Sequence, residues 1–219
     1  MNRTTRFTRT TALGLGAALA ASAFAGLSAT SATAAPAAKA PGTTSLAEVL
    51  DADGNKFDKE HGDFDIVDRA VRTVLGAKPD SPVGVLADGN TRVTAFIPTD
   101  KAFMRLVKDV AGSMPETEKA TFDAVATFGV DTIEAVLLYH VVAGDTINSK
   151  EAAGADGAEL TMASGGIVTV NVTDGGSIKL QDADTDDTNA KVIPAKVDIN
   201  KGNKQIAHGI SRVLRPINL

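Results

Sequence analysis

The spacing of apolar residues along this chain changes once, close to Tyr139. Before that point apolar residues recur every three or four positions, as on one face of a helix. After it they alternate with polar residues or form β-branched runs, as in strands. Helices that come first and strands that come later, without regular alternation, favour an α+β fold over a doubly wound sheet. We therefore predict a single α+β domain.

The expected helices combine an apolar stripe with a capping residue at the start. Asp63 is suited to cap the first helix, and the pairs Ser113 with Glu116 and Asp131 with Glu134 are typical of capping boxes. The predicted helical stripes lie in residues 64–75, 103–111 and 133–137, and the predicted strands in residues 93–97, 141–142, 160–162, 168–172, 178–180, 197–199 and 206–214.

Residues 1–34 have the pattern of a secretory signal peptide. Three arginines, Arg3, Arg6 and Arg9, precede an apolar run over residues 11–27, and Ala32-Thr33-Ala34 matches an A-x-A cleavage site. We therefore expect a secreted, extracellular protein. No later apolar stretch reaches about 20 residues, so we expect no membrane insertion once the signal has been removed.

Residues 35–44 are rich in Ala, Pro, Gly and Thr and contain no large apolar side chain. Such a segment cannot build a core, and we predict a flexible lead-in there. The remaining residues, 45–219, are the predicted domain, and a chain of this size can bury a core without covalent staples.

The composition excludes several classes of protein. The chain contains no cysteine, which rules out disulfides, a thiolate nucleophile and cysteine-ligated zinc. Its 22 Lys and Arg face 27 Asp and Glu, a formal net charge of −5, which argues against nucleic acid as a partner. With one Tyr and no Trp, a platform for stacking bases or sugars is not expected.

Residues 93–103 predict a corner at which a strand hands over to a helix. Pro98 cannot donate a hydrogen bond to a sheet and should end the strand. Thr99 is suited to the N-cap, Asp100 complements the helix dipole in the first turn, and Phe103 begins the buried stripe. These four residues are therefore expected to be structural.

Three stretches of the chain, in order, resemble motifs of the fasciclin domain family. Val93–Phe103 is similar to the segment T-x-F-x-P-T-D-x-A-F, Leu137–Gly144 to the Tyr-His motif, and Ile206–Pro216 to the closing segment I-H-x-I-D-x-V-L-x-P. The resemblance covers about residues 45–219. It implies a wedge-shaped β-sandwich flanked by helices, and a role in adhesion or protein binding outside the cell.

The resemblance also makes Tyr139 and His140 candidates for protein binding. The alternative is that both are structural. In that case the Tyr139 ring packs in the core, and His140 satisfies a buried polar group, for which Thr99 or Asp100 is the expected partner.

The third motif contains two further candidates for structural roles, His208 and Pro216. His208 shares a strand face with Ile206 and Ile210, so we expect a hydrogen-bonded core histidine instead of a ligand-binding one. Ser211 stands where the family pattern has Asp, so no role of that carboxylate carries over to this chain.

Two acidic segments raise the question of calcium. Residues 51–62 begin like an EF-hand loop but lack its turning glycine and its final glutamate. Asp182, Asp184 and Asp186 place carboxylates at alternate positions and are candidates for weak calcium binding only. We expect solvated acidic loops and no cofactor, and keep a calcium-dependent extracellular structural module as an alternative function.

Motifs of known enzyme classes are missing from the sequence. It has no G-x-S-x-G, H-E-x-x-H or phosphate-binding glycine loop. A Ser-His-Asp triad assembled from distant positions would make the chain a hydrolase, which is the second alternative. We predict a non-catalytic module whose partners are extracellular or cell-surface proteins or matrix.

Overall fold

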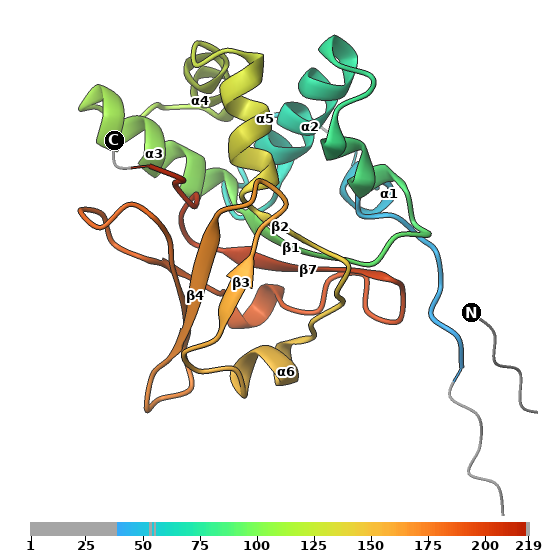
Figure 1. Cartoon of the computed structure of the whole chain (residues 1–219). Helices are drawn as coiled ribbons and strands as arrows, with labels where there is room; N and C mark the ends of the chain where they lie inside the picture. The colour runs from blue at the N-terminus through green and yellow to red at the C-terminus, as the bar shows by residue number, and fades with distance from the viewer. Residues whose placement is uncertain (1–38, 53, 55, 218–219) are drawn as a thin grey trace, which may run out of the picture. The chain divides into compact units, whose positions relative to one another are not determined.

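The computed structural model describes residues 39–52, 54 and 56–217 (Figure 1). The predicted signal peptide and residues 35–38 of the predicted lead-in lie outside these residues. From Ala40 onward the described chain forms one compact unit. Within the described residues, no helix combines the length and the apolar character needed to span a bilayer.

Helices dominate the first part of this unit. The α-helices are α1 (Leu46–Asp51), α2 (Asp65–Ala77), α3 (Asp100–Ala111), α4 (Glu118–Ala126), α5 (Val130–Leu138) and α6 (Ser149–Ala153), with short 3-10 helices η1 (Pro82–Ala87) and η2 (Pro194–Lys196).

Three helix starts differ from the prediction. The predicted capping pair Asp131–Glu134 does not form, because the N-cap residue of α5 is Gly129 and no side chain caps this helix. The prediction of a capping box at Ser113 and Glu116 is wrong, because α4 begins at Glu118. The Thr117 side chain caps this helix by accepting a hydrogen bond from the Ala120 amide. Asp63 does not cap α2 either. Its N-cap residue is Phe64, and the Asp100 side chain accepts the hydrogen bonds of the first amides of α2 instead.

The first sheet has three strands in the order β2-β1-β7: β2 (Val141–Ala143), β1 (Val93–Pro98) and β7 (Gln205–Ile210). β1 is central, antiparallel to β2 and parallel to β7, and every residue of β1 and β7 is buried. Because β7 ends at Ile210, the last strand is shorter than the predicted range 206–214, and residues 211–217 lie outside the sheet.

The second sheet has four antiparallel strands in the order β3-β4-β5-β6. Its strands are β3 (Glu159–Thr161), β4 (Ile167–Val172), β5 (Ile178–Gln181) and β6 (Ala190–Lys191). The strand predicted at 197–199 is wrong, because that segment forms only an isolated bridge between Ile199 and Ala207.

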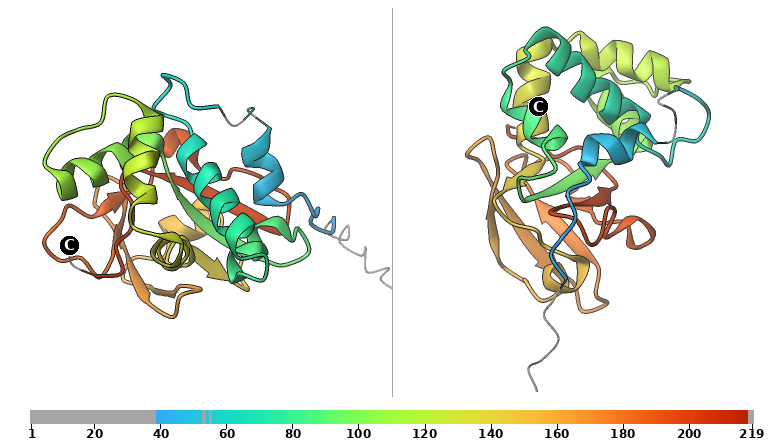
Figure 2. Two further views of the ribbon diagram at one scale, coloured as in Figure 1. Left: turned by 90° about the horizontal axis from the view of Figure 1, so that it is seen from above. Right: turned by 90° about the vertical axis from the view of Figure 1, so that its right-hand side faces the viewer.

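The two sheets and the helices pack as layers (Figure 2). Val93, Ala95 and Ile97 of β1 point into a core shared with α2, α3 and α5. Phe96, between them, points the opposite way, into a core shared with β4 and β5. This is the alternation of a strand with one layer on each face. The predicted α+β sandwich flanked by helices of the N-terminal half is confirmed.

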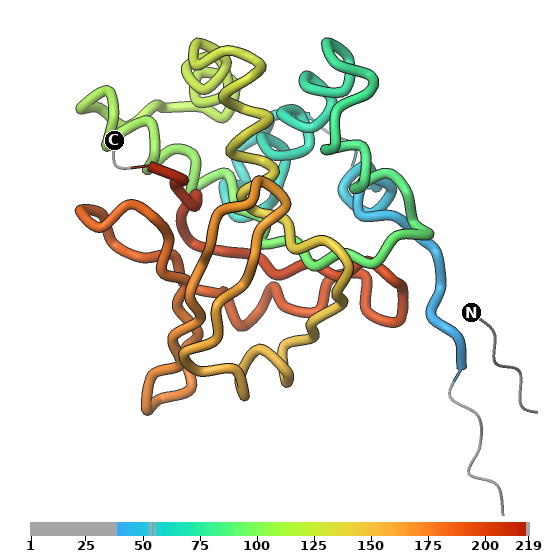
Figure 3. Tube along the Cα trace, in the orientation of Figure 1, coloured from blue at the N-terminus to red at the C-terminus, as the bar shows by residue number. Residues whose placement is uncertain are grey.

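The segment before α1 is attached to the domain. Gly42 exchanges backbone hydrogen bonds with Gly202 and Lys204, and the Thr44 carbonyl accepts one from the Asn200 side chain. A Cβ on Gly89 would lie 1.7 Å from the Thr43 carbonyl oxygen, so only glycine permits this approach. The contacts of the domain thus begin before the predicted boundary at Ser45, and the tube in Figure 3 shows the path of this segment.

Candidate binding site at the three motifs

The first motif forms the expected corner. β1 ends at Pro98, Thr99 is the N-cap residue of α3 although its side chain makes no capping bond, and Phe103 is buried. Asp100 is fully buried, and its Oδ1 accepts a hydrogen bond from the Ile66 amide at 2.8 Å. Burial, with the Asp63 carboxyl beside it, raises the pKa of Asp100 to about 9. The Asp100 carboxyl is therefore protonated at neutral pH. Because Asp100 is the first residue of α3 and accepts a hydrogen bond from the Ile66 amide of α2, it links the starts of these two helices.

Tyr139 lies between the two layers of sheet and is 1% exposed. Its hydroxyl donates a hydrogen bond to the Ile167 carbonyl at 2.8 Å and accepts one from the Ala183 amide at 3.1 Å. A Cβ on Gly166 would lie 2.5 Å from the ring. The side chain thus fits against the β3–β4 turn, and a partner protein cannot touch it without moving that turn.

His140 is buried as well, and both ring nitrogens face backbone groups. Nδ1 lies 2.7 Å from the Val136 carbonyl, and Nε2 lies 2.8 Å from the Leu214 amide, from which it must accept. Nδ1 therefore carries the proton. Burial lowers the pKa of His140 to about 4, so the ring is neutral. The expected partners Thr99 and Asp100 were wrong, because His140 bonds to α5 and to the third motif instead.

His208 is buried in β7 with backbone partners on both sides. Nε2 lies 2.9 Å from the Ile147 carbonyl, and Nδ1 accepts from the Asp198 amide at 3.3 Å. Each ring nitrogen of His140 and His208 thus faces a backbone group, and neither ring is placed to activate a serine hydroxyl.

The acidic loop 182–187 binds the third motif. Asp182 accepts a hydrogen bond from the Arg215 amide at 2.8 Å, and Asp184, 2% exposed, lies 3.0 Å from the Arg215 guanidinium. Although burial opposes it, this guanidinium holds the pKa of Asp184 below its usual value. Asp109 and Asp187 also pair with Arg215. These carboxylates therefore fix the C-terminal segment.

Ser211 stabilises the same region without a carboxylate. Its hydroxyl accepts a hydrogen bond from the Lys191 amide at 3.0 Å, and its carbonyl accepts one from the Arg105 side chain. This serine thus links β6, α3 and the end of β7.

A cavity of about 490 Å³ lies where the three motifs meet, and we call it the motif cavity. Pro98 and Phe103 come from the first motif, His140 from the second, and residues 213–216 from the third. Parts of α3, α4 and α5 complete the walls, and most wall side chains are apolar. A pocket of this size and character is typical of ligand sites, which span roughly 300–1,000 Å³.

The rim of the motif cavity exposes large apolar side chains. Five such side chains are exposed in the described residues: Val110, Met114, Phe128, Ile167 and Ile217. Three of these five, Val110 at 48%, Phe128 at 38% and Ile217 at 63% exposure, line the motif cavity. A gathering of exposed apolar groups around a hollow marks an interaction surface.

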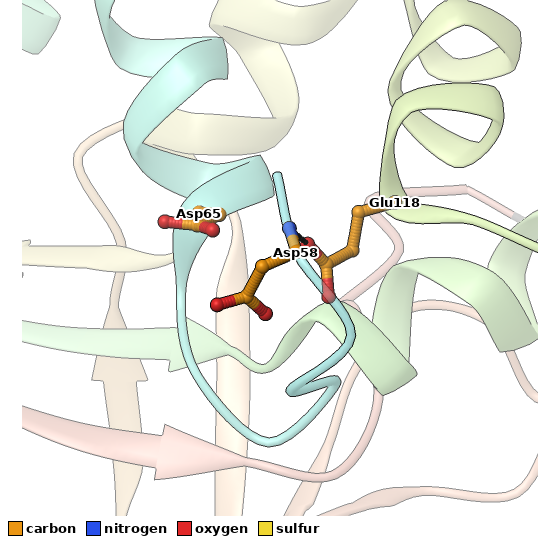
Figure 4. Close-up of side chains that lie close together, drawn as sticks. All are labelled: Asp58, Asp65 and Glu118. Carbon is orange, nitrogen blue, oxygen red and sulfur yellow. Dashed lines mark hydrogen bonds between the residues drawn. The ribbon is translucent and has the colours of Figure 1, made fainter. Parts of the chain in front are cut away.

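A separate acidic cluster lies at the start of α2 and α4. Carboxylate oxygens of Asp58, Asp65 and Glu118 lie within 4.8 Å of one another (Figure 4), and so do those of Asp63, Asp65 and Asp100. Glu118 is fully buried and accepts a hydrogen bond from the Asp58 amide at 2.6 Å.

Sequence patterns did not reveal this acidic cluster. Its carboxylates come from three separate segments of the chain and not from a run of neighbouring acids. Even the loop residues Asp58, Asp63 and Asp65 did not stand out, because their spacing matches no metal-binding motif.

Comparison with known proteins agrees with the three motifs. The model of the Fasciclin domain matches residues 80–216, more than half of the chain. No curated protein matches. A solved structure that matches is a FAS1 domain pair from the insect cell adhesion molecule Fasciclin I, with 16% identity and a TM-score of 0.47. The match covers 68% of this chain and 47% of that one, so the chain spans about half the length of the pair. The chain belongs to the fasciclin domain family, whose domains act in adhesion and protein interaction.

Proposed function

We propose that this chain is a secreted, non-catalytic adhesion or protein-interaction module that binds extracellular or cell-surface proteins or matrix. Membership of the fasciclin family supports the class of function. The signal-peptide pattern in residues 1–34 supports secretion.

The observation that carries the proposal is the apolar rim of the motif cavity. Val110, Phe128 and Ile217 present apolar surface to solvent at the meeting point of the three motifs. Interfaces are built around such apolar anchors, with aromatic residues enriched among them. Phe128 is therefore the proposed central contact.

Tyr139 and His140 support binding indirectly in this proposal. Both side chains are buried, but His140 forms part of the cavity wall and holds Leu214 through its hydrogen bond. Substituting either residue is expected to weaken binding through loss of structure, in proportion to the loss of stability.

The test compares two surface variants in a solid-phase assay on cell surfaces and extracellular matrix proteins. Phe128→Asp should weaken saturable binding by about tenfold or more, because it places a charge in an apolar contact. Ile167→Asp is the matched control, since Ile167 is 51% exposed but lies in β4, outside the cavity wall. Absence of saturable binding to any surface, or equal effects of the two variants, would contradict the proposal.

Secretion is tested separately by fractionating cells and culture medium. We expect the chain in the medium, shortened by cleavage after Ala34. Retention of the full-length chain in the membrane pellet would contradict this part of the proposal.

A further inference from the structure

The motif cavity reaches from the apolar rim into the core. Ala70, Phe103 and Leu214, which line it, are 1%, 4% and 0% exposed, whereas Val110 and Ile217 at its rim are about half exposed or more. A space that passes from solvent to fully buried carbon atoms suits a narrow apolar molecule. Water molecules are poorly stabilised in the inner part of the cavity, because a buried water needs two to four polar partners and most wall side chains are apolar.

The charged groups in the wall are already neutralised. Arg215 pairs with Asp109, Asp184 and Asp187. Asp131, at the exposed end of α5, pairs with Lys78, which holds the pKa of Asp131 below its usual value.

The remaining titratable residue in the wall, His140, bonds to two backbone groups and is neutral. Among the described residues, the inner wall therefore offers no free charge to a ligand, and the part of a ligand that enters there is expected to be uncharged.

We infer that the motif cavity binds the hydrocarbon chain of a single-chain lipid, such as a fatty acid, with the polar head left at the rim. The volume of about 490 Å³ suits one small molecule. The formal net charge of −5 opposes docking of the whole domain on an anionic bilayer. A free single-chain lipid is therefore the expected occupant. This inference does not depend on the proposed adhesion function.

The experiment measures uptake of cis-parinaric acid, a fluorescent fatty acid, by the secreted chain after lipid removal. We expect saturable uptake, competition by palmitate, and similar competition by hexadecanol because the head stays in solvent. Ala135 is exposed and lines the cavity from α5, so Ala135→Phe should fill the entrance without removing a core contact. Uptake should then weaken by about tenfold or more. Ala153→Phe, at an exposed alanine of α6 outside the cavity, is the matched control.

Methyl NMR identifies the site even if a variant fails to fold. Addition of palmitate to the unmodified chain should shift the methyl signals of Val110, Val136 and Val213, which line the cavity, and leave that of Val168 between the sheets unchanged. Three outcomes would overturn the inference: no saturable uptake, equal uptake by folded Ala135→Phe, or shifts confined to other regions. Binding to phosphatidylcholine vesicles without uptake of free fatty acid would also overturn it, in favour of a bilayer surface.

Because the test of adhesion uses Phe128→Asp and the test of lipid uptake uses Ala135→Phe, the two proposals can fail independently. Loss of cell binding with lipid uptake intact would contradict only the adhesion proposal. Cell binding without lipid uptake would contradict only the present inference.

Discussion

His140 joins two parts of the chain that are distant in sequence. Its ring bonds to the carbonyl of Val136 in α5 and to the amide of Leu214 in the third motif. Both bonds require a neutral ring with the proton on Nδ1. A second proton would have to enter a buried site in which Nε2 is already occupied by a donor.

This arrangement predicts an acid-sensitive contribution to stability. The unfolded chain protonates His140 below about pH 6.5, whereas the folded chain does so only near a pKa of about 4. The unfolded state therefore binds more protons between these values, and the free energy of unfolding falls as the pH falls through this window, by roughly 3 kcal/mol in total. Urea unfolding across this range should show a shallower decline for His140→Gln than for the unmodified chain. Equal slopes would contradict the prediction.

Asp100 is the second residue whose protonation matters to the fold. It is fully buried, it accepts hydrogen bonds from the first amides of α2, and the Asp63 carboxyl lies beside it. Oδ1 of Asp63 is itself buried, and within the described part of the chain a proton on Asp100 is what could donate a hydrogen bond to it.

Substitutions at Asp100 test this protonated state. Asp100→Asn keeps an acceptor for the Ile66 amide and adds a donor toward Asp63, so its stability should match that of the unmodified chain within about 1 kcal/mol near pH 4. At neutral pH Asp100→Asn should be the more stable of the two, because only the unfolded Asp100 gains free energy by ionising. Asp100→Ala removes the cap of α2 and should be about 1–2 kcal/mol less stable than Asp100→Asn. The folded-state pKa of about 9 lies above the unfolded value of 3.8, so stability should decline as the pH rises between them. Urea unfolding should show this decline in the unmodified chain and not in Asp100→Asn.

At the scale of elements, the C-terminal segment after β7 depends on the acidic loop between β5 and β6. Arg215 is 7% exposed and pairs with Asp184, which is 2% exposed. Arg212 on the same segment pairs with Asp109 and Asp187 but is more exposed. The two arginines therefore offer a comparison between a buried and a partly exposed ion pair.

Arg215→Ala should destabilise the domain by roughly 3 kcal/mol or more, because it leaves the Asp184 carboxylate buried without its partner. Arg212→Ala should cost less than about 1 kcal/mol, since its pairs are partly solvated. Thermal or urea unfolding of both variants measures the difference. Similar losses for both would show that the burial of Asp184 does not decide the stability of this loop.

At the scale of the molecule, three layers meet at β1. This strand is central in its sheet, faces the helices with one side and the second sheet with the other, and passes directly into α3 at Pro98. The motif cavity lies on the helical side, between α3, α5 and the C-terminal segment. The family motifs therefore occupy the junction that connects the layers.

The same arrangement predicts the response to calcium. Asp182 and Asp184 of the acidic loop already bond to Arg215, so this loop has few free oxygens for a hard cation. We expect millimolar calcium to leave the melting temperature unchanged, measured by calorimetry with magnesium as the control. A calcium-specific rise would contradict this expectation and favour the calcium-dependent alternative. The acidic cluster around Asp65 and Glu118 would then be the first place to look, by way of Asp58→Asn.

Local sequence patterns were sufficient for the class of fold and for most of its elements. The period of apolar residues and the residue types of turns depend on positions that are close in sequence. Such local patterns therefore predicted the apolar faces of α2 and α3, the β4–β5 hairpin and the corner at Pro98. The start of α4 could not be predicted in this way, because Ser113 and Thr117 are both suited to cap a helix and the structure uses Thr117. The same holds for residues 197–199, whose β-branched pattern lacks the pairing that a full strand needs.

Only the tertiary structure decided the partners of the buried polar groups and the existence of the motif cavity. The Leu214 amide that His140 binds is 74 positions away, and the Ile66 amide that Asp100 caps is 34 positions away. Such a hydrogen bond needs its two atoms to lie about 3 Å apart. The positions of two residues along the chain do not show whether the fold brings them that close. By itself, the sequence determined most of the longer helices and strands and the family that they resemble, but not the short helices α1 and α6. Packing of those segments determined that Tyr139 and His140 are buried and that the apolar surface of the three motifs is a cavity.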